Sequence, residues 1–135
     1  MIEHKLRISV KGIFKNAAGE VLLVKLGRNG QDFWSAPGGG VEENESIADT
    51  LAREFKEETG FSVKIGDLIF VQDIKFSSGV RQLELFFEGE VLESISEAEE
   101  EFKFFSKEDF ANIEFLPKNL DPFAEHQKIP FSSEI

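Results

Sequence analysis

A glycine-rich turn followed by a short amphipathic segment constrains this chain more than any other feature. The turn is Gly38–Gly40, and the segment runs from Ile47 to Thr59 and closes at Gly60. Its apolar residues recur at the three- and four-residue spacing of a helix with one buried face: Ile47, Ala48, Leu51, Ala52 and Phe55. Asn44 or Ser46 can cap the start of this segment, and a glycine at its end can adopt the left-handed conformation that stops a helix. We therefore predict a helix over residues 47–59.

Three carboxylates project from one stripe of this predicted helix. Glu54, Glu57 and Glu58 stand at positions i, i+3 and i+4, about a quarter turn from the centre of the apolar stripe. Like charges at this spacing repel each other, and Arg53 and Lys56 offset only part of that repulsion. A hard divalent cation would offset more, because Mg²⁺ takes oxygen ligands from carboxylates and phosphates. The alternative is a solvated acidic face, which is the commoner meaning of a glutamate-rich helix. The preceding glycine turn and the adjacent apolar stripe favour the cation site.

The same residues resemble the signature of the Nudix hydrolases. That pattern is a glycine, five residues, a glutamate, seven residues, and then Arg-Glu-apolar-any-Glu-Glu-any-Gly-apolar. Gly39, Glu45 and residues 53–61 fill every fixed position, so that chance agreement is negligible. The preceding run Trp34-Ser35-Ala36-Pro37-Gly38 also resembles the lead-in of the family. Asn44 replaces a glycine that many members carry, but asparagine tolerates left-handed backbone.

The resemblance implies a fold and an activity. The expected fold is α/β, a Nudix-type α/β/α sandwich with a mixed β-sheet, as a single domain over residues 1–135. The expected reaction is hydrolysis of a nucleoside diphosphate linked to a further group, with Mg²⁺ or Mn²⁺ as cofactor. Divalent ions neutralise phosphate oxygens, orient the diphosphate and lower the pKa of the attacking water.

The resemblance also implies roles for individual residues. The metal ligands that it implies are Gly38 (through its carbonyl), Glu54, Glu57 and Glu58. Glu54 or Glu57 would double as general base, and Arg53 would orient the glutamates. We expect Glu45 to hold the turn against the start of the helix rather than to take part in the chemistry.

An acidic segment at residues 93–101 is a second place where a functional carboxylate is expected. Nudix members often supply a further catalytic or metal-binding glutamate from a loop in this region, before a strand that Phe102–Phe105 resembles. We favour Glu101, followed by Glu97. Taken alone, the segment is a solvated run of charge.

Candidate substrate contacts come from loops and strands outside the signature. The candidates are Arg28, Trp34 and Arg81, with Lys25, Gln82 and Glu84 as further choices. Arg28 could meet a phosphate and Trp34 could stack on a base. The competing interpretations are a solvated loop charge for Arg28, a core residue for Trp34 and an ordinary exposed strand residue for Arg81.

The remaining chain predicts a sheet with helices at its C-terminal end. We expect strands at residues 6–14, 20–26, 33–35, 61–76 with a break at 66–67, and 81–92. Turns at 16–19 and 77–79 would make hairpins, and residues 27–32 would form a loop. We expect a short helix that Ser106 caps and that ends near residue 113, and another that opens at Asp121 and ends near residue 128.

Composition limits the class of partner and the compartment. The chain has 135 residues, 41% of them hydrophobic and 15 of them Phe, which favours one domain with a real core. A net charge of −11 argues against a nucleic-acid polymer or an anionic membrane as partner, although bound metals would still admit a nucleotide. The absence of cysteine, of a signal peptide and of an apolar run of membrane length favours a soluble cytoplasmic protein.

The exact substrate is less constrained than the reaction. Some dinucleoside-polyphosphate members carry a tyrosine where this chain has Phe76, and ADP-ribose members often carry a proline near Lys75. Neither marker is present, so neither subclass is supported. A small single-domain chain fits a nucleoside triphosphate pyrophosphohydrolase, which releases a monophosphate and pyrophosphate. The alternatives are an ADP-ribose or nucleotide-sugar pyrophosphatase, and a non-catalytic module that senses a nucleotide. A homodimer is expected by analogy with the family alone.

Overall fold

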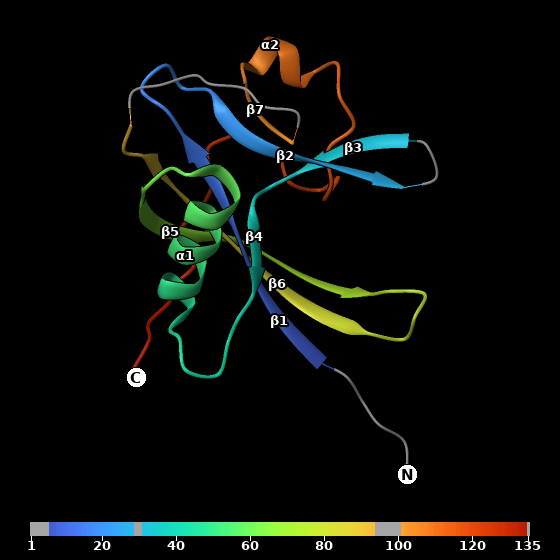
Figure 1. Ribbon diagram of the computed structural model, residues 1–135, viewed down its shortest axis with the longest axis vertical. Coiled ribbons are helices and arrows are strands. Elements are labelled where there is room, and N and C mark those ends of the chain that lie inside the picture. The colour runs from blue at the N-terminus through green and yellow to red at the C-terminus, as the bar shows by residue number, and fades with distance from the viewer. Residues whose placement is uncertain (1–5, 29–30, 94–100, 135) are drawn as a thin grey trace.

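The computed structural model describes residues 6–28, 31–93 and 101–134, and its elements are shown in Figure 1. The strands are β1 (Leu6–Lys15), β2 (Val21–Arg28), β3 (Gln31–Ser35), β4 (Gly38–Gly40), β5 (Val63–Lys75), β6 (Arg81–Val91) and β7 (Phe102–Phe105). The helices are α1 (Ile47–Thr59) and α2 (Lys107–Phe110). None of the helices in these ranges is long and apolar enough to cross a membrane.

The strands form one mixed sheet with β1 at its centre. The seven-stranded sheet follows the order β3-β2-β1-β6-β5, with β4 paired to β1 and β7 paired to β2. β1 runs parallel to β6 over ten residue pairs and antiparallel to β2 and β4. This arrangement confirms the predicted mixed sheet, and both predicted hairpins are present.

Helix α1 has the bounds that the sequence predicts, because its start and its end are fixed by local chemistry. The Ser46 side chain accepts a hydrogen bond from the Asp49 backbone N–H at 3.0 Å and caps the first turn. Gly60 takes a left-handed conformation with φ of 81° and donates its N–H to the Lys56 carbonyl at 2.9 Å. Phe55 is fully buried and meets Phe14 of β1 edge to face, with ring centroids 4.9 Å apart. The helix therefore lies fixed on the sheet.

Two apolar cores lie on opposite faces of the sheet and define an α/β/α sandwich. The core under α1 includes Val10, Phe14, Leu22, Leu51, Phe55 and Phe87. The core on the other face includes Ile13, Leu23, Phe86, Phe105 and Phe115. The short helix α2 and the turns that follow it cover that second core, and Figure 1 shows α2 close to β7 and away from α1. The predicted fold class is confirmed, although the second outer layer is mostly irregular.

The predicted helix at residues 121–128 is wrong. The Asp121 side chain accepts a hydrogen bond from the Phe123 N–H at 2.9 Å, and its carbonyl accepts from the Ala124 N–H at 3.2 Å. Such side-chain bonds to a nearby backbone offer the chain a turn in place of a helix. Further along, Ile129 forms a β-bridge with Leu68, which holds the chain extended. A turn followed by a bridge leaves no room for a helix.

Other predicted boundaries shift by a few residues. Ser106 caps α2 as expected, but the helix ends at Phe110 and turns lead to residue 113. β2 and β3 extend into the predicted loop over 27–32, where Gly27 pairs with Asp32. The predicted break at 66–67 is a register irregularity, with β5 continuing on both sides of it.

Candidate functional site

The glycine strand β4 lies between β1 and the carboxylates of α1. Its three residues pair with Ser9, Val10 and Lys11 of β1. A Cβ atom on Gly38 would lie 1.9 Å from the Val10 carbonyl oxygen, and one on Gly39 would lie 2.5 Å from Cδ of Glu54. The glycines are therefore required at these two positions, one for the approach of β1 and the other for the approach of the Glu54 carboxylate.

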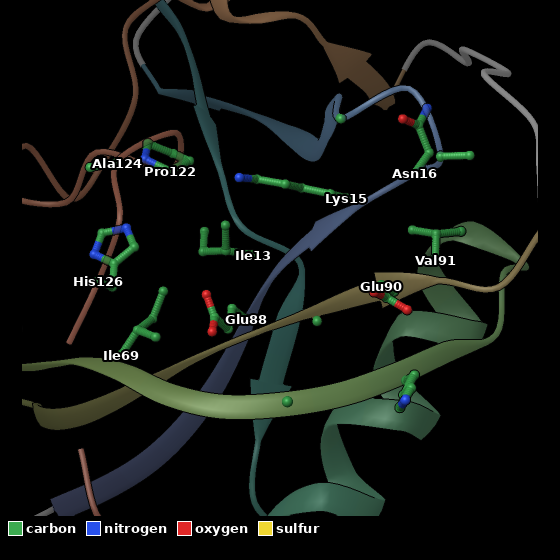
Figure 2. A pocket seen from close by; sticks show the side chains of 15 residues that line it. Ile13, Lys15, Asn16, Ile69, Glu88, Glu90, Val91, Pro122, Ala124 and His126 are labelled. Atoms are coloured by element: carbon green, nitrogen blue, oxygen red, sulfur yellow. The ribbon is translucent and has the colours of Figure 1, made fainter. Parts of the chain in front are cut away.

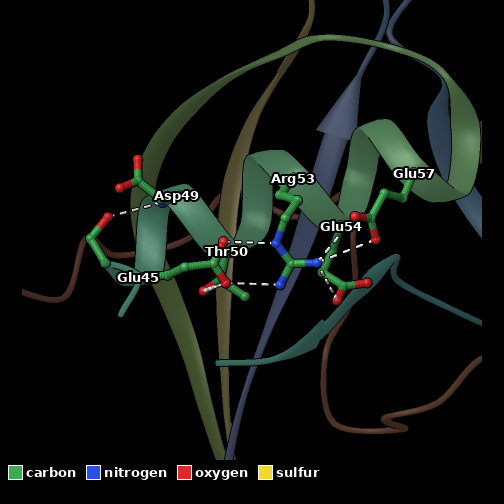
Figure 3. A network of polar contacts seen from close by, with 7 residues as sticks. Glu45, Asp49, Thr50, Arg53, Glu54 and Glu57 are labelled. Atoms are coloured by element: carbon green, nitrogen blue, oxygen red, sulfur yellow. Dashed lines mark hydrogen bonds and ion pairs between the residues drawn. The ribbon is translucent and has the colours of Figure 1, made fainter. Parts of the chain in front are cut away.

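Arg53 connects three glutamates, as Figure 3 shows. Its Nε and Nη2 donate to the two carboxylate oxygens of Glu45 at 2.7 Å and 2.8 Å. Its Nη1 donates to Glu54 at 3.2 Å and to Glu57 at 3.2 Å. One guanidinium thus sets the positions of two of the candidate metal ligands and anchors itself on Glu45.

Both carboxylate oxygens of Glu45 accept hydrogen bonds at the start of the helix. The Arg53 hydrogen bonds lower the pKa of its carboxyl group, and the Thr50 hydroxyl donates to the same carboxylate at 3.2 Å. The same ion pair raises the pKa of the Arg53 guanidinium. With both oxygens occupied, Glu45 holds the turn to the helix, which is the place that the sequence predicted for it.

Glu58 has the most perturbed carboxyl group of this helix. Its pKa is raised to about 7, chiefly by partial burial and also by the neighbouring Glu54 carboxylate, against the opposing effects of Lys11 and of a backbone hydrogen bond from Gly38. Much of the residue is exposed, but its carboxyl group faces these neighbours and is partly removed from water. The Glu54 and Glu58 carboxyl groups thus lie near each other, and two like charges at this distance repel.

These donors fit a hard divalent cation by their chemistry. The two adjacent carboxylates offer only oxygen ligands and carry repelling charges that a cation would neutralise. Glu57 is turned toward Arg53, and its side chain is 60% exposed. Within the described ranges, no group of three or more acidic or histidine side chains is arranged to hold a metal ion. A full ligand set would need Glu57 to turn away from Arg53, or a backbone oxygen such as that of Gly38.

Some predicted substrate contacts lie elsewhere. Arg81 forms a two-point ion pair with Asp73 at 2.9 Å and 2.6 Å, on the exposed β5–β6 hairpin. Trp34 is half-buried and packs edge to face on Phe105, with ring centroids 4.7 Å apart, so it belongs to the second core. Arg28 ends β2, and its side chain lies outside the described part of the structure.

The structure describes only the end of the acidic segment. Glu101 is exposed, and its backbone carbonyl accepts a hydrogen bond from the Lys25 N–H at 2.8 Å, which places it beside β2. Glu97 lies outside the described residues. The structure therefore brings together Glu54, Glu57, Glu58, Arg53 and Gly38, but it leaves the downstream glutamate as a prediction.

An open hollow of about 720 Å³ borders the glycine strand and the start of α1. The lining residues are Leu6, Arg7, Ile8, Gly40, Val41, Glu42, Glu43, Glu45 and Glu54. The sequence analysis missed Arg7, the one cation among them. The alternation of β1 places Arg7 on the same face as Ser9, but only the pairing of β1 with β4 shows that this face meets the glycines.

A second hollow of about 660 Å³ lies at the other end of β1 (Figure 2). Lys15, Glu88 and His126 surround it with apolar walls, and His126 Nε2 lies 2.8 Å from the Asp121 carbonyl oxygen. Neither the glycine strand nor a glutamate of α1 lines it. It is therefore separate from the candidate active site.

Comparison with known proteins gives the family of this chain. A model of the NUDIX domain family matches residues 5–127. The chain belongs to the Nudix family. The family resemblance predicted from the sequence is thereby confirmed, and Nudix hydrolases act on phosphoric anhydride bonds.

Individual relatives match this Nudix chain over different shares of their length. An RNA pyrophosphohydrolase from Pasteurella multocida (strain Pm70) is 37% identical over 65 residues, which are 48% of this chain and 32% of the relative. The match thus spans about a third of that protein. A MutT protein structure from Methanosarcina mazei Go1 has a TM-score of 0.67 and 28% identity, and the match covers 87% of this chain and 88% of that chain. A MutT structure from work on Aliivibrio salmonicida and Vibrio cholerae has a TM-score of 0.59 and 29% identity. The match covers 87% of this chain and 93% of that chain.

Proposed function

We propose that this Nudix domain hydrolyses a phosphoric anhydride bond of a nucleoside triphosphate and releases a nucleoside monophosphate and pyrophosphate. The observation that carries the proposal is the position of the Glu54 carboxylate against the glycine strand, with Arg53 bonded to Glu54 and Glu57. The Glu58 carboxyl group lies near Glu54. The open hollow next to Glu54 gives a polyphosphate access to these groups. We place the reaction in the cytoplasm.

The reaction needs a water molecule, a base and neutralised phosphate charge. The water oxygen forms a new bond to one phosphorus of the anhydride, and the bridging oxygen leaves with its electron pair on the other phosphate. The proton of the water passes to a carboxylate, for which Glu54 and Glu57 are the candidates. A Mg²⁺ or Mn²⁺ ion, bound through Glu54, Glu57, Glu58 and the Gly38 carbonyl, would neutralise phosphate oxygens and make the water more acidic.

The protein's own part in this reaction is to position these groups. Arg53 holds Glu54 through its Nη1 atom, which also bonds Glu57, so a metal that draws Glu57 away leaves the bond to Glu54 in place. Gly39 allows the Glu54 carboxylate to lie against the backbone of β4. Fixing the acting groups before the substrate binds reduces the entropy that must be lost on the way to the transition state.

A second candidate substrate is the 5′-triphosphate end of RNA. It is favoured by the similarity to the RNA pyrophosphohydrolase of Pasteurella multocida, although the net charge of −11 disfavours a polyanionic chain. ADP-ribose and nucleotide sugars are further alternatives, as is nucleotide sensing without turnover. A homodimer is also expected by family analogy, and light scattering of the purified protein would test it.

The test is product release from a panel of substrates. Nucleoside triphosphates, ADP-ribose, a nucleotide sugar and a short RNA with a 5′-triphosphate should each be assayed with Mg²⁺, with Mn²⁺ and with EDTA. We expect monophosphate and pyrophosphate from free triphosphates, and no product with EDTA. Thermal shift on the same panel separates binding from turnover, since stabilisation without product would support a sensing module and overturn the hydrolase proposal.

A matched pair of variants tests the site itself. Glu57→Gln should remove most turnover and leave the thermal unfolding midpoint near that of the wild type. Glu125→Gln removes an exposed carboxylate of the C-terminal segment and should leave turnover unchanged. Near-normal turnover by Glu57→Gln at saturating Mg²⁺ would reject the role assigned to Glu57.

A further inference from the structure

We propose that Arg7 binds the terminal phosphate of the substrate and thereby selects nucleoside triphosphates over ADP-ribose and nucleotide sugars. The proposal rests on the proposed function, because it assigns a substrate-binding residue to the same site. It concerns a residue of β1, outside the signature on α1 and β4.

Arg7 lies close enough to Glu54 to bind a second phosphate of a substrate whose first phosphate is bound at the glutamates. Its Nη2 atom is 3.3 Å from the position that a Cβ atom on Gly40 would occupy. On the adjoining residue, Gly39, the corresponding position is 2.5 Å from the Glu54 carboxyl carbon. The guanidinium and the carboxylate therefore approach neighbouring residues of the same short strand, and both line the 720 Å³ hollow.

The floor between these groups is free of large side chains. β4 consists of glycine alone, and Ser9, which pairs with Gly40, is 3% exposed. The Ser9 hydroxyl donates to the Gly39 carbonyl at 3.3 Å, so it is directed at the backbone of β4. A phosphate chain beside Glu54 could thus reach Arg7 past Gly40, the residue of β4 that lines the hollow.

Arg7 is also a cation that is available to a ligand at the Gly40 end of β4, while Lys11 lies opposite Gly38 and acts on Glu58. Arg53 is occupied by Glu45, Glu54 and Glu57, and Lys56 donates to the Gly60 carbonyl at 2.9 Å. No carboxylate among the described residues forms an ion pair with Arg7. Its residue is exposed, and a guanidinium can bind two phosphate oxygens at once with its planar donors.

The charge of the substrate explains the expected selectivity. In ADP-ribose and in nucleotide sugars, an organic group closes each end of the diphosphate, so no free terminal phosphate exists. A nucleoside triphosphate ends in a phosphate with additional negative charge. Glu42, Glu43 and Glu45 line the same hollow and would repel that charge, so a cation at this place has a large effect on which substrate binds.

The test compares two variants on two classes of substrate. Arg7→Met should lower kcat/KM for nucleoside triphosphates by about tenfold to a hundredfold, which is the range for losing a charged hydrogen bond. The same variant should change kcat/KM for ADP-ribose by less than about threefold. Arg7→Lys should recover part of the loss, since it restores the charge but not the two-point geometry. Equal losses on both substrate classes, or no loss on triphosphates, would overturn the proposal.

A control and a binding measurement separate this proposal from the proposed function. Lys15→Met removes another cation from β1, at the end away from the glycine strand, and should leave both substrates unaffected. Calorimetric titration with inorganic tripolyphosphate should show weaker binding to Arg7→Met than to the wild type, whether or not the protein turns over any nucleotide. Unchanged tripolyphosphate affinity would overturn the assignment of Arg7, whereas a wild type without turnover would overturn only the proposed function.

Discussion

Arg53 and Glu45 form a two-point ion pair that spans the start of α1, with donor–acceptor distances of 2.7 Å and 2.8 Å. The pair uses two of the guanidinium nitrogens and leaves the third, Nη1, for Glu54 and Glu57. Glu45, which lies outside the helix, thereby holds the guanidinium that bonds Glu54 and Glu57 of the helix. The position of the candidate ligands thus depends on the turn before α1 as well as on α1.

Arg53→Lys should reduce turnover by about tenfold or more, because an ammonium group cannot bind Glu45 at two points and reach two further carboxylates. The measurement is kcat with a triphosphate at saturating Mg²⁺. Circular dichroism should show an unchanged helix, since Ser46 and Gly60 cap α1 without help from Arg53. An Arg53→Lys enzyme with wild-type kcat would show that the network does not position the acting groups.

Gly39→Ala should impair activity through Glu54. The added Cβ would lie 2.5 Å from the Glu54 carboxyl carbon, so that carboxylate must move away from β4. We expect weaker binding of Mg²⁺, measured by titration calorimetry, together with lower kcat. Gly40→Ala is the comparison, because its Cβ meets only the end of the flexible Arg7 side chain at 3.3 Å. If both variants bind Mg²⁺ as the wild type does, contact with Gly39 does not set the position of Glu54.

Helix α1 was predictable because its determinants are local. The spacing of Leu51 and Phe55, the Ser46 cap and the Gly60 stop all lie within fifteen positions of one another, and each acts through a neighbouring residue. The hairpin turns are local in the same sense. The family signature covers the same segment, so the sequence also singled out the glutamates of this helix as candidate metal ligands, although it predicted a glycine turn where the structure has the strand β4.

Features that depend on distant pairing were not predictable. The chain after Asp121 is held extended by the bridge between Ile129 and Leu68, which competes with helix formation and leaves no trace near residue 121. Arg7 reaches the site only because β1 pairs with β4, and thirty-odd positions separate those strands. The ion pair of Arg81 with Asp73 was not predictable either, because its two residues lie on opposite strands of a hairpin.

Phe55→Ala should destabilise the fold strongly. Phe55 is fully buried between α1 and β1, and truncating a buried phenylalanine typically costs about 3–5 kcal/mol of unfolding free energy. Urea denaturation followed by fluorescence or circular dichroism measures that difference. Phe131→Ala is the matched control, because Phe131 is 42% exposed and, among the described aromatic rings, its ring contacts only that of Phe87 of β6, so its loss should cost about 1 kcal/mol or less. Similar losses in both variants would contradict the assignment of Phe55 to the core.

The raised pKa of Glu58 predicts a pH dependence in the metal-free protein. The pKa is 4.5 for an unperturbed glutamate and about 7 here, so the folded state binds a proton more tightly than the unfolded state between these values. The contribution of Glu58 to stability is therefore present in full below pH 4.5 and is lost as the pH rises toward 7. Thermal unfolding in EDTA should show this loss, and Glu58→Gln should reduce it.

Mg²⁺ should oppose the loss of stability at higher pH, because a bound cation must displace the proton that Glu58 carries at lower pH. The rise in unfolding temperature on adding Mg²⁺ should consequently be larger at pH 8 than at pH 6, on either side of the pKa of about 7. In Glu58→Gln, which has no proton to lose, the Mg²⁺ effect should be smaller and should depend less on pH. An equal Mg²⁺ effect at both pH values in the wild type would show that Glu58 does not bind the ion, and the ligand set would then have to come from Glu54, Glu57 and the glycine strand.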